Sequence, residues 1–84
     1  MKYTVVLAKP AQKQLDKLPN AVANSIIEEI FALSNNPRPA GCKKLKGSDS
    51  FRIRVGNYRV IYEIFDRMLI VKVIAVGHRK DIYE

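Results

Sequence analysis

The chain has 84 residues, of which 15 are Lys or Arg and 8 are Asp or Glu, so its formal net charge at pH 7 is +7. This length suits one domain with one hydrophobic core and leaves no room for a second core. The charge is uneven, because residues 1–37 carry four basic and three acidic side chains whereas residues 38–84 carry eleven and five. Such an excess in one half predicts a polyanion or an acidic protein as partner, whereas a basic surface kept only for solubility would be spread evenly.

The cysteine and histidine counts argue against several kinds of site. Cys42 is the only cysteine and His78 the only histidine, so an internal disulfide is impossible and a zinc site would need carboxylates, which are scarce here. We therefore expect neither a metal nor another cofactor. The first apolar run is broken by Lys9 and Pro10 and is too short for a signal peptide, and no stretch approaches the ~20 apolar residues of a membrane span. A cytoplasmic protein without a membrane partner is the default expectation.

The N-terminal half of the chain predicts a strand followed by a helical hairpin. Residues 2–8 contain the apolar run of a strand, and Pro10 suits the first turn of a helix, where its missing N–H is not needed. Apolar side chains then recur at helical spacing until Pro19 interrupts them. Asn20 is a suitable N-cap for a second helix, which the turn-forming residues 34–37 end. The apolar stripe of this second helix consists of Val22, Ile26, Ile30 and Leu33.

The C-terminal half predicts three β-strands. Residues 37–49 contain Gly, Pro and several lysines, which is typical of a basic loop. From residue 51 onward the pattern changes to strands rich in Val, Ile, Phe and Tyr, expected at residues 51–55, 58–65 and 68–76. With the first half, they predict an α+β fold: an N-terminal strand, a helical hairpin and a three-stranded antiparallel meander, with the helices packed on one face of the sheet.

Two short turns set the expected register of this meander. Gly56-Asn57, between two alternating segments, predicts a tight hairpin. Asp66-Arg67 predicts a second turn of two residues. The resulting cross-strand pairs are Arg54 with Arg59, Tyr62 with Val71, Ile61 with Lys72, and Arg59 with Ile74.

The first hairpin gathers basic side chains on one face of the sheet. Because side chains alternate along a strand, Arg52, Arg54 and Arg59 share this face, and Lys72 joins them in the expected register. Like charges directly across a strand pair repel one another, and an anion bound between them would remove that cost. The alternative is that the arginines protect an exposed sheet face or edge from aggregation. The sequence leaves both explanations open.

Arginines in this arrangement are suited to binding a phosphate, because a guanidinium group offers charge and paired hydrogen bonds together. Arg79 follows the last strand, and Tyr83 lies four residues later, so both can reach the same place. A phosphodiester held there can be cleaved by the 2′-hydroxyl of RNA: a base removes the 2′ proton, cations stabilise the phosphorane, and an acid protonates the leaving 5′ oxygen. This chemistry needs no metal.

Two residues compete for the proton transfers. Tyr83 is a candidate base, since nearby cations would lower its pKa from the ordinary value near ~10. His78 titrates closer to neutrality and is the rival base or acid. Each also has a structural explanation, because Tyr83 can pack the C-terminus in place and His78 can serve as a hydrogen-bonding residue.

The order and spacing of these motifs resemble the RelE/ParE superfamily of small bacterial and archaeal toxins. The resemblance covers essentially all 84 residues and implies a single RelE-like toxin domain over residues 1–84. It implies a cognate antitoxin partner and, for the RelE branch, a ribosome-dependent endoribonuclease that cleaves mRNA in the A site. The matching segments are Lys-Leu-Lys-Gly at 44–47, Phe-Arg-Ile-Arg at 51–54, Tyr-Arg-Val-Ile-Tyr at 58–62 and Val-Gly-His-Arg-Lys-Asp-Ile-Tyr at 76–83.

The resemblance also implies which residues form the site. The catalytic set it implies falls on Arg52, Arg54, Arg59, Arg79 and Tyr83, and we add His78 as a further candidate. The residues expected to contact RNA or the ribosome are Lys43, Lys44, Lys46, Lys72 and Lys80. Well-known RelE-type enzymes have lysines at the first two arginine positions, and arginine is a poor proton donor, so the acid step would pass to His78, Lys80 or water.

Two other functions remain open from the sequence. The ParE branch shares the fold but poisons DNA gyrase. A non-catalytic module of the same fold would only bind an acidic partner or nucleic acid. Under each of these functions the net charge of +7 would suit an acidic antitoxin segment laid across the cationic face.

Overall fold

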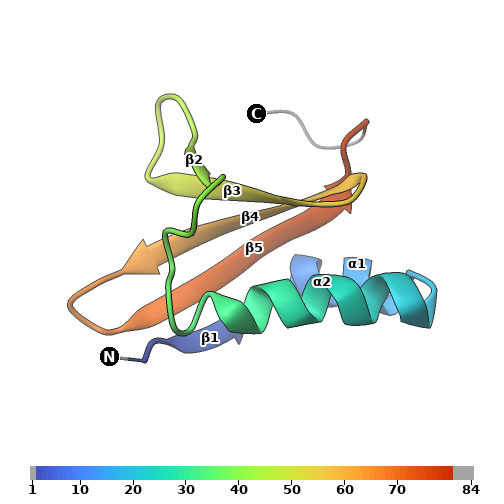
Figure 1. The fold of residues 1–84 in the computed structure, drawn as a ribbon, viewed down its shortest axis with the longest axis horizontal. Helices are drawn as coiled ribbons and strands as arrows, with labels where there is room; N and C mark the ends of the chain where they lie inside the picture. Colours follow the sequence, from blue (N-terminus) through green and yellow to red (C-terminus); the bar gives the residue numbers. More distant parts are fainter. Residues whose placement is uncertain (1, 81–84) are drawn as a thin grey trace.

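A five-stranded sheet carries two helices on one of its faces in the computed structural model, which describes residues 2–80 (Figure 1). The strands lie in the order β1-β5-β4-β3-β2, with β1 parallel to β5 and the other neighbours antiparallel. The predicted α+β class is confirmed. In chain order the elements are β1 (Thr4–Leu7), α1 (Lys9–Asp16), α2 (Asn20–Ala32), β2 (Lys43–Lys44), β3 (Ser50–Val55), β4 (Tyr58–Phe65) and β5 (Ile70–His78).

Both predicted helices are present, but the cap of the second differs from the expectation. Pro10 lies in the first turn of α1, as its sequence position indicates. Helix α2 begins at Asn20 itself, and Pro19 occupies the cap position with no side-chain capping bond. The Pro19 carbonyl oxygen accepts the Ala23 N–H at 2.9 Å, so the backbone alone starts the helix. Asn20 is therefore not the N-cap, because Pro19 occupies that position.

The hydrophobic core lies between the two helices and the inner face of the sheet. Each helix contributes one buried stripe, with Ala11 and Leu15 from α1 and Ile26 and Ile30 from α2. Burying one such aliphatic side chain stabilises the fold by roughly 1.5–3 kcal/mol, so this layer supplies most of the driving force. The largest fully buried side chains are Tyr62, Ile26, Ile30, Leu33, Val60, Val71, Val73 and Val76.

The register between β4 and β5 differs from the predicted one. Four residues, 66–69, separate the strands instead of two, and Leu69 has a left-handed φ of 53°. Tyr62 therefore pairs with Val73 and Glu63 with Lys72. A bulge follows, because Tyr62 and Ile61 pair with Val73 and Ala75 and leave Ile74 between the paired residues. The pairing continues to Tyr58 with His78 and Arg59 with Gly77, so β5 runs alongside β4 to the β3–β4 turn.

A further strand, β2, occupies part of the segment that the sequence predicts as loop. Lys43 pairs with Arg52 and Lys44 with Phe51, at the outer edge of β3. A two-residue strand is too short to show alternation, and lysine is disfavoured in strands, so the sequence carries no signal for it. Its effect is to hold two exposed lysines beside the arginine-bearing strand.

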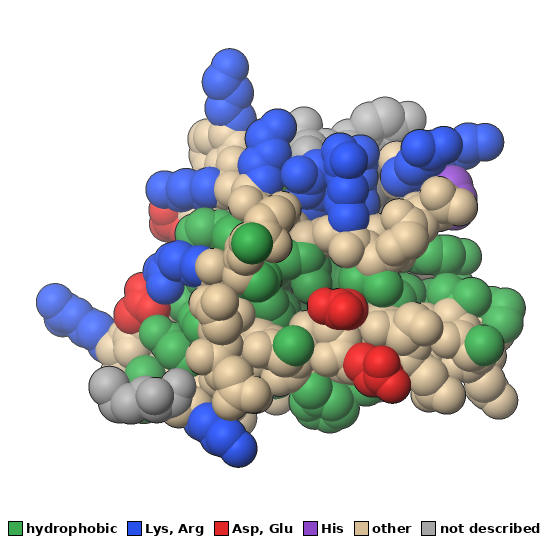
Figure 2. All heavy atoms as spheres, in the orientation of Figure 1, with side chains coloured by type: hydrophobic (Ala, Val, Ile, Leu, Met, Phe, Trp, Pro, Cys, Tyr) green, Lys and Arg blue, Asp and Glu red, His purple; other side chains and the backbone are tan. Residues whose placement is uncertain are grey.

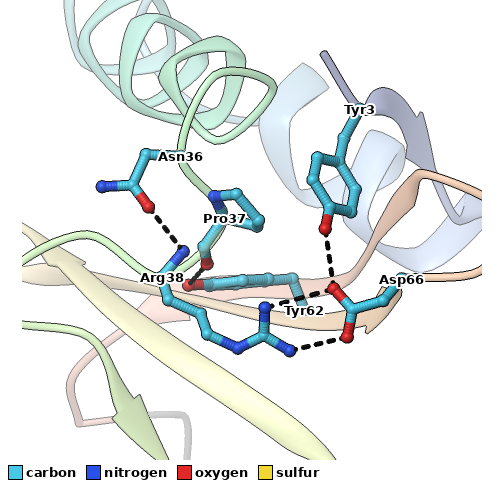
Figure 3. Close-up of polar contacts among 6 residues, drawn as sticks. All are labelled: Tyr3, Asn36, Pro37, Arg38, Tyr62 and Asp66. Carbon is cyan, nitrogen blue, oxygen red and sulfur yellow. Dashed lines mark hydrogen bonds and ion pairs between the residues drawn. The ribbon is translucent and has the colours of Figure 1, made fainter. Parts of the chain in front are cut away.

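Polar contacts fasten the end of the sheet at the 66–69 turn (Figure 3). The Arg38 guanidinium donates to both carboxylate oxygens of Asp66, at 3.2 and 2.9 Å, and the Tyr3 hydroxyl donates to the same carboxylate at 2.7 Å. These two donors lower the pKa of Asp66 to about 2. The buried Tyr62 hydroxyl donates to the Pro37 carbonyl oxygen at 2.7 Å, and burial raises its pKa. The segment after α2 is thereby fixed to the sheet.

No helix within residues 2–80 is long and apolar enough to cross a membrane.

Candidate functional site

Basic side chains gather over one edge of the molecule. Figure 2 shows Lys and Arg side chains concentrated over β2, β3 and the β3–β4 turn, with hydrophobic and acidic side chains on the helical side below. The concentration follows from the sequence, because residues 38–84 carry most of the excess charge. This basic surface indicates that the functional site lies on the sheet rather than on the helices.

Three arginines from separate segments line one small depression. Arg54 at the end of β3 lies directly opposite Arg59 on β4, as predicted. Arg79, which follows β5, joins them, and the depression has a volume of about 120 Å³. Its remaining lining residues are Gly56, Asn57 and Tyr58. Three guanidinium groups around a space of this size are suited to one phosphate-sized anion.

The β3–β4 turn brings Arg79 to this place. Gly56 has a φ of 59°, a left-handed conformation that glycine adopts without the steric cost of a side chain, and it allows the tight two-residue turn. The Arg79 N–H then donates to the Asn57 carbonyl oxygen at 2.8 Å. Reasoning from the sequence missed this contact. Gly56-Asn57 signals the turn, but only the true β4–β5 register shows that the end of β5 reaches it.

Arg52 lies in a different environment from the other arginines. Arg52 is 6% exposed, whereas Arg54 is exposed, so Arg52 does not belong to the exposed basic surface. It lines a larger cavity of about 550 Å³ between the end of α2, the loop 39–41 and β3, together with Glu29 and Arg54. Ile61, which lies opposite Arg52 on β4, is also buried. Arg54 thus borders both the cavity and the depression.

The predicted lysines fall into three places. Lys43, Lys44 and Lys46 are exposed on β2 and the loop after it. Lys80 is exposed directly after Arg79. Lys72 is exposed as well, but it pairs with Glu63 near the other end of the sheet, so the structure separates it from the arginine depression.

The structure describes His78 but not Tyr83. Because His78 pairs with Tyr58, its side chain lies on the helical face of the sheet, opposite to the face that carries Arg59. It lines a cavity of about 460 Å³ together with Pro10, Gln14 and Leu18 from the α1 side. Tyr83 lies outside the described residues, and its role as base stays a prediction. Among residues 2–80 there is no group of three or more His, Cys, Asp or Glu arranged to hold a metal ion.

Comparison with known proteins gives consistent matches over nearly the whole chain. The toxin RelG of Mycobacterium tuberculosis is 37% identical over 86 residues, covering 99% of this chain and 98% of RelG. The mRNA interferase toxin RelE of Escherichia coli K12 is 29% identical, covering 95% and 86%. The crystal structure of the toxin–antitoxin complex RelBE2 of Mycobacterium tuberculosis superposes with a TM-score of 0.86 at 33% identity, covering 94% of this chain and 93% of the matched chain.

A family model gives the same result. Residues 5–83 match the model described as the ParE toxin of the type II toxin–antitoxin system parDE. The resemblance inferred from the motifs is thereby confirmed. The chain belongs to the ParE toxin family of type II toxin–antitoxin systems.

Proposed function

We propose that this protein is the toxin of a toxin–antitoxin pair and that it cleaves mRNA as an endoribonuclease. The observation that carries the proposal is the convergence of Arg54, Arg59 and Arg79 on one depression. Two of them, Arg54 and Arg59, lie directly opposite each other across a strand pair, so their side chains can reach the same anion. The relative named mRNA interferase RelE supports RNA as the source of that anion.

The proposed reaction is attack of the RNA 2′-hydroxyl on the adjacent phosphate. The 2′ oxygen forms a bond to phosphorus as the bond to the 5′ oxygen breaks, which leaves a 2′,3′-cyclic phosphate and a 5′-hydroxyl. Arg54, Arg59 and Arg79 bind the phosphate and stabilise the charge of the phosphorane. Arg52, which lines the neighbouring cavity together with Arg54, adds further positive charge.

The proton transfers need groups that titrate more easily than arginine. Tyr83 is the proposed base, because cations beside a phenol lower its pKa and favour the phenolate. Arginine stays protonated, so the leaving 5′ oxygen receives its proton from Lys80 or water. The mechanism requires no metal ion.

We propose that the ribosome presents the substrate. Cleavage would occur in the A site during translation, and Lys43, Lys44 and Lys46 would contact ribosomal RNA. Lys43 and Lys44 are exposed on β2 beside β3, and Lys46 is exposed in the loop that follows, so they add to the positive field of this half of the chain. The solved toxin–antitoxin complex of a relative supports a cognate antitoxin as partner. An antitoxin with an acidic segment would neutralise the toxin by covering this basic edge.

Poisoning of DNA gyrase is the second candidate function. The description of the matching family names ParE, which favours it. The relatives named mRNA interferases and the arginine depression favour RNA cleavage. A binding module without catalysis is the third candidate, and it would show salt-sensitive binding to nucleic acid without cleavage products.

Primer extension on a translated message distinguishes these functions. After induction of the protein in bacteria, we expect growth arrest and cuts at positions set by the reading frame. The matched control is a message with a disabled start codon, which should stay uncut if the ribosome presents the substrate. Uncut message together with gyrase-linked DNA breaks would replace the ribonuclease proposal with the gyrase one. Growth arrest without either lesion would favour the binding module.

A further inference from the structure

The imidazole of His78 is held by two contacts at the end of β5. Its Nδ1 atom accepts a hydrogen bond from the backbone N–H of Lys80 at 3.2 Å. Its ring packs edge-on against the ring of Tyr58, with centroids 5.4 Å apart and an interplanar angle of 77°. The ring is therefore fixed to β4 on one side and to the chain that follows β5 on the other.

Arg79 lies between two fixed peptide groups as a result. Its own N–H donates to the Asn57 carbonyl oxygen at 2.8 Å, which fixes the peptide before it. The Lys80 N–H donates to the His78 ring, which fixes the peptide after it. Because peptide groups are planar, fixing both leaves the φ and ψ angles of Arg79 little freedom. The direction in which its side chain leaves the backbone is thereby set toward Arg54 and Arg59.

The geometry also defines the chemical state of the imidazole. An Nδ1 atom that accepts the Lys80 N–H carries no proton, so a proton on this ring lies on Nε2. The ring itself lies on the helical face of the sheet, away from the face of Arg59. Neither feature suits direct proton exchange with a phosphodiester bound among the arginines.

We infer that His78 is a positioning residue, whose Nδ1 atom holds the Lys80 N–H so that Arg79 points at the scissile phosphate. It acts through Arg79 and transfers no proton in the reaction. This inference rests on the proposed function for the identity of the phosphate, but its geometric part can be tested without any cleavage assay.

Two substitutions separate the hydrogen bond from the ring. His78→Asn keeps an acceptor, because an Asn side-chain oxygen readily accepts the N–H two residues ahead, but it cannot act as a neutral-pH acid or base. His78→Phe keeps a ring against Tyr58 and removes the acceptor. We expect H78N to retain cleavage within about threefold of wild type. H78F should lose about tenfold in cleavage, mainly in kcat, because a displaced Arg79 guanidinium binds the transition state less well. Loss of cleavage in H78N comparable to that in H78F would overturn the inference.

A double-mutant cycle tests whether His78 acts through Arg79. If it does, adding H78F to R79A should change cleavage by less than about twofold, because the positioned group is already absent. A further tenfold loss in the double variant would show that His78 contributes independently, as a catalytic acid or base would. Circular dichroism and thermal unfolding of each variant show that the fold is retained.

NMR of the wild-type imidazole nitrogens tests the geometry directly. We expect an unprotonated Nδ1 and a protonated Nε2, together with slowed hydrogen exchange of the Lys80 amide that H78F abolishes and H78N retains. A proton on Nδ1 would overturn the inference. If the wild-type protein cuts no message, the proposed function fails, and the positioning role is then tested by the affinity for a short RNA oligonucleotide. H78F should weaken this binding and H78N should not. Equal affinities of the two variants would overturn the positioning role.

Discussion

The two ends of strand β4 use arginine in opposite ways. At the 66–69 turn, the Arg38 guanidinium donates two hydrogen bonds to the Asp66 carboxylate, and this ion pair holds the loop after α2 against the sheet (Figure 3). At the β3–β4 turn, Arg54, Arg59 and Arg79 surround one depression. The first arrangement places opposite charges in contact, and the second brings three like charges around one depression. The surroundings of an arginine, rather than the residue type, therefore decide whether its charge stabilises the fold or is available to bind a ligand.

Removing Arg79 should have the largest effect on function. We expect Arg79→Ala to lower cleavage, and with it toxicity, by about 100-fold or more, which is typical when one donor that stabilises a transition state is removed. Thermal unfolding should change little, because the side chain is exposed and the Asn57 contact uses the backbone N–H. Growth after induction and primer extension measure the result.

Arg67→Ala is the matched control for this variant. It removes an exposed arginine from the turn at the other end of the sheet and should leave cleavage unchanged. Full toxicity of the Arg79 variant would move the site away from the depression. Equal loss in both variants would indicate that total charge, rather than the position of the guanidinium, carries the activity.

Removing the Tyr62 hydroxyl should have the largest effect on stability among the single-atom changes considered. The hydroxyl donates to the Pro37 carbonyl oxygen at 2.7 Å, and both residues are buried. Tyr62→Phe leaves that carbonyl without its partner, which costs about 1–2 kcal/mol in the free energy of unfolding. Urea denaturation measures the loss, while cleavage by the folded fraction should stay at the wild-type level.

Tyr58→Phe provides the comparison at the other end of β4. No hydrogen bond of the Tyr58 hydroxyl occurs within the part of the chain that the structure describes, so this change should alter stability by less than Tyr62→Phe. A Tyr62 variant as stable as wild type would show that the Pro37 contact does not fasten the loop.

The fold could be predicted from the sequence because its signals are local. Helical spacing around Ile26 and Ile30, strand alternation after residue 51, and the turn at Gly56-Asn57 each lie within a few residues of one another. The same signals correctly place Arg54 opposite Arg59. They fail where a structural feature depends on distant contacts.

The β4–β5 register is the clearest example of such a failure. Asp66 resembles a turn residue in the sequence, but its bonds to Arg38 and Tyr3 come from far along the chain and accompany a four-residue turn. The bulge at Ile74 then shifts the register again. The position of Arg79 depends on this register, so its sequence position indicates only that Arg79 can reach the other arginines. The burial of Arg52 could not be predicted for a related reason, since alternation gives the side of a strand but not what covers it.

The Asp66 contacts predict a dependence of stability on low pH. The pKa of Asp66 is about 2 in the folded protein and near ~3.9 in an unfolded chain, so the folded state favours the carboxylate. The resulting stability is fully present above pH ~4 and is lost as the pH falls toward 2. Urea midpoints measured across this range should therefore fall. Arg38→Gln removes the largest cause of the lowered Asp66 pKa, and Asp66→Asn removes the titrating group. In both variants the part of the decrease in the urea midpoint that is due to Asp66 should disappear. An unchanged decrease in both variants would contradict the assignment of this pH dependence to Asp66.

The smallest expected effect comes from relieving the repulsion in the arginine depression. Arg54 and Arg59 form a directly opposed like-charge pair, which costs a few tenths of a kcal/mol. Arg54→Gln should therefore raise the free energy of unfolding by about 0.3 kcal/mol at low salt, although it weakens cleavage. The gain should vanish near 0.5 M salt, where the Debye length is only about 4 Å. Arg54→Lys keeps the charge and should show no gain, so a salt-independent gain in both variants would point to strand propensity instead of repulsion. Greater stability together with lower activity in Arg54→Gln would show that this end of β4 maintains its charge for a ligand and at the expense of the fold.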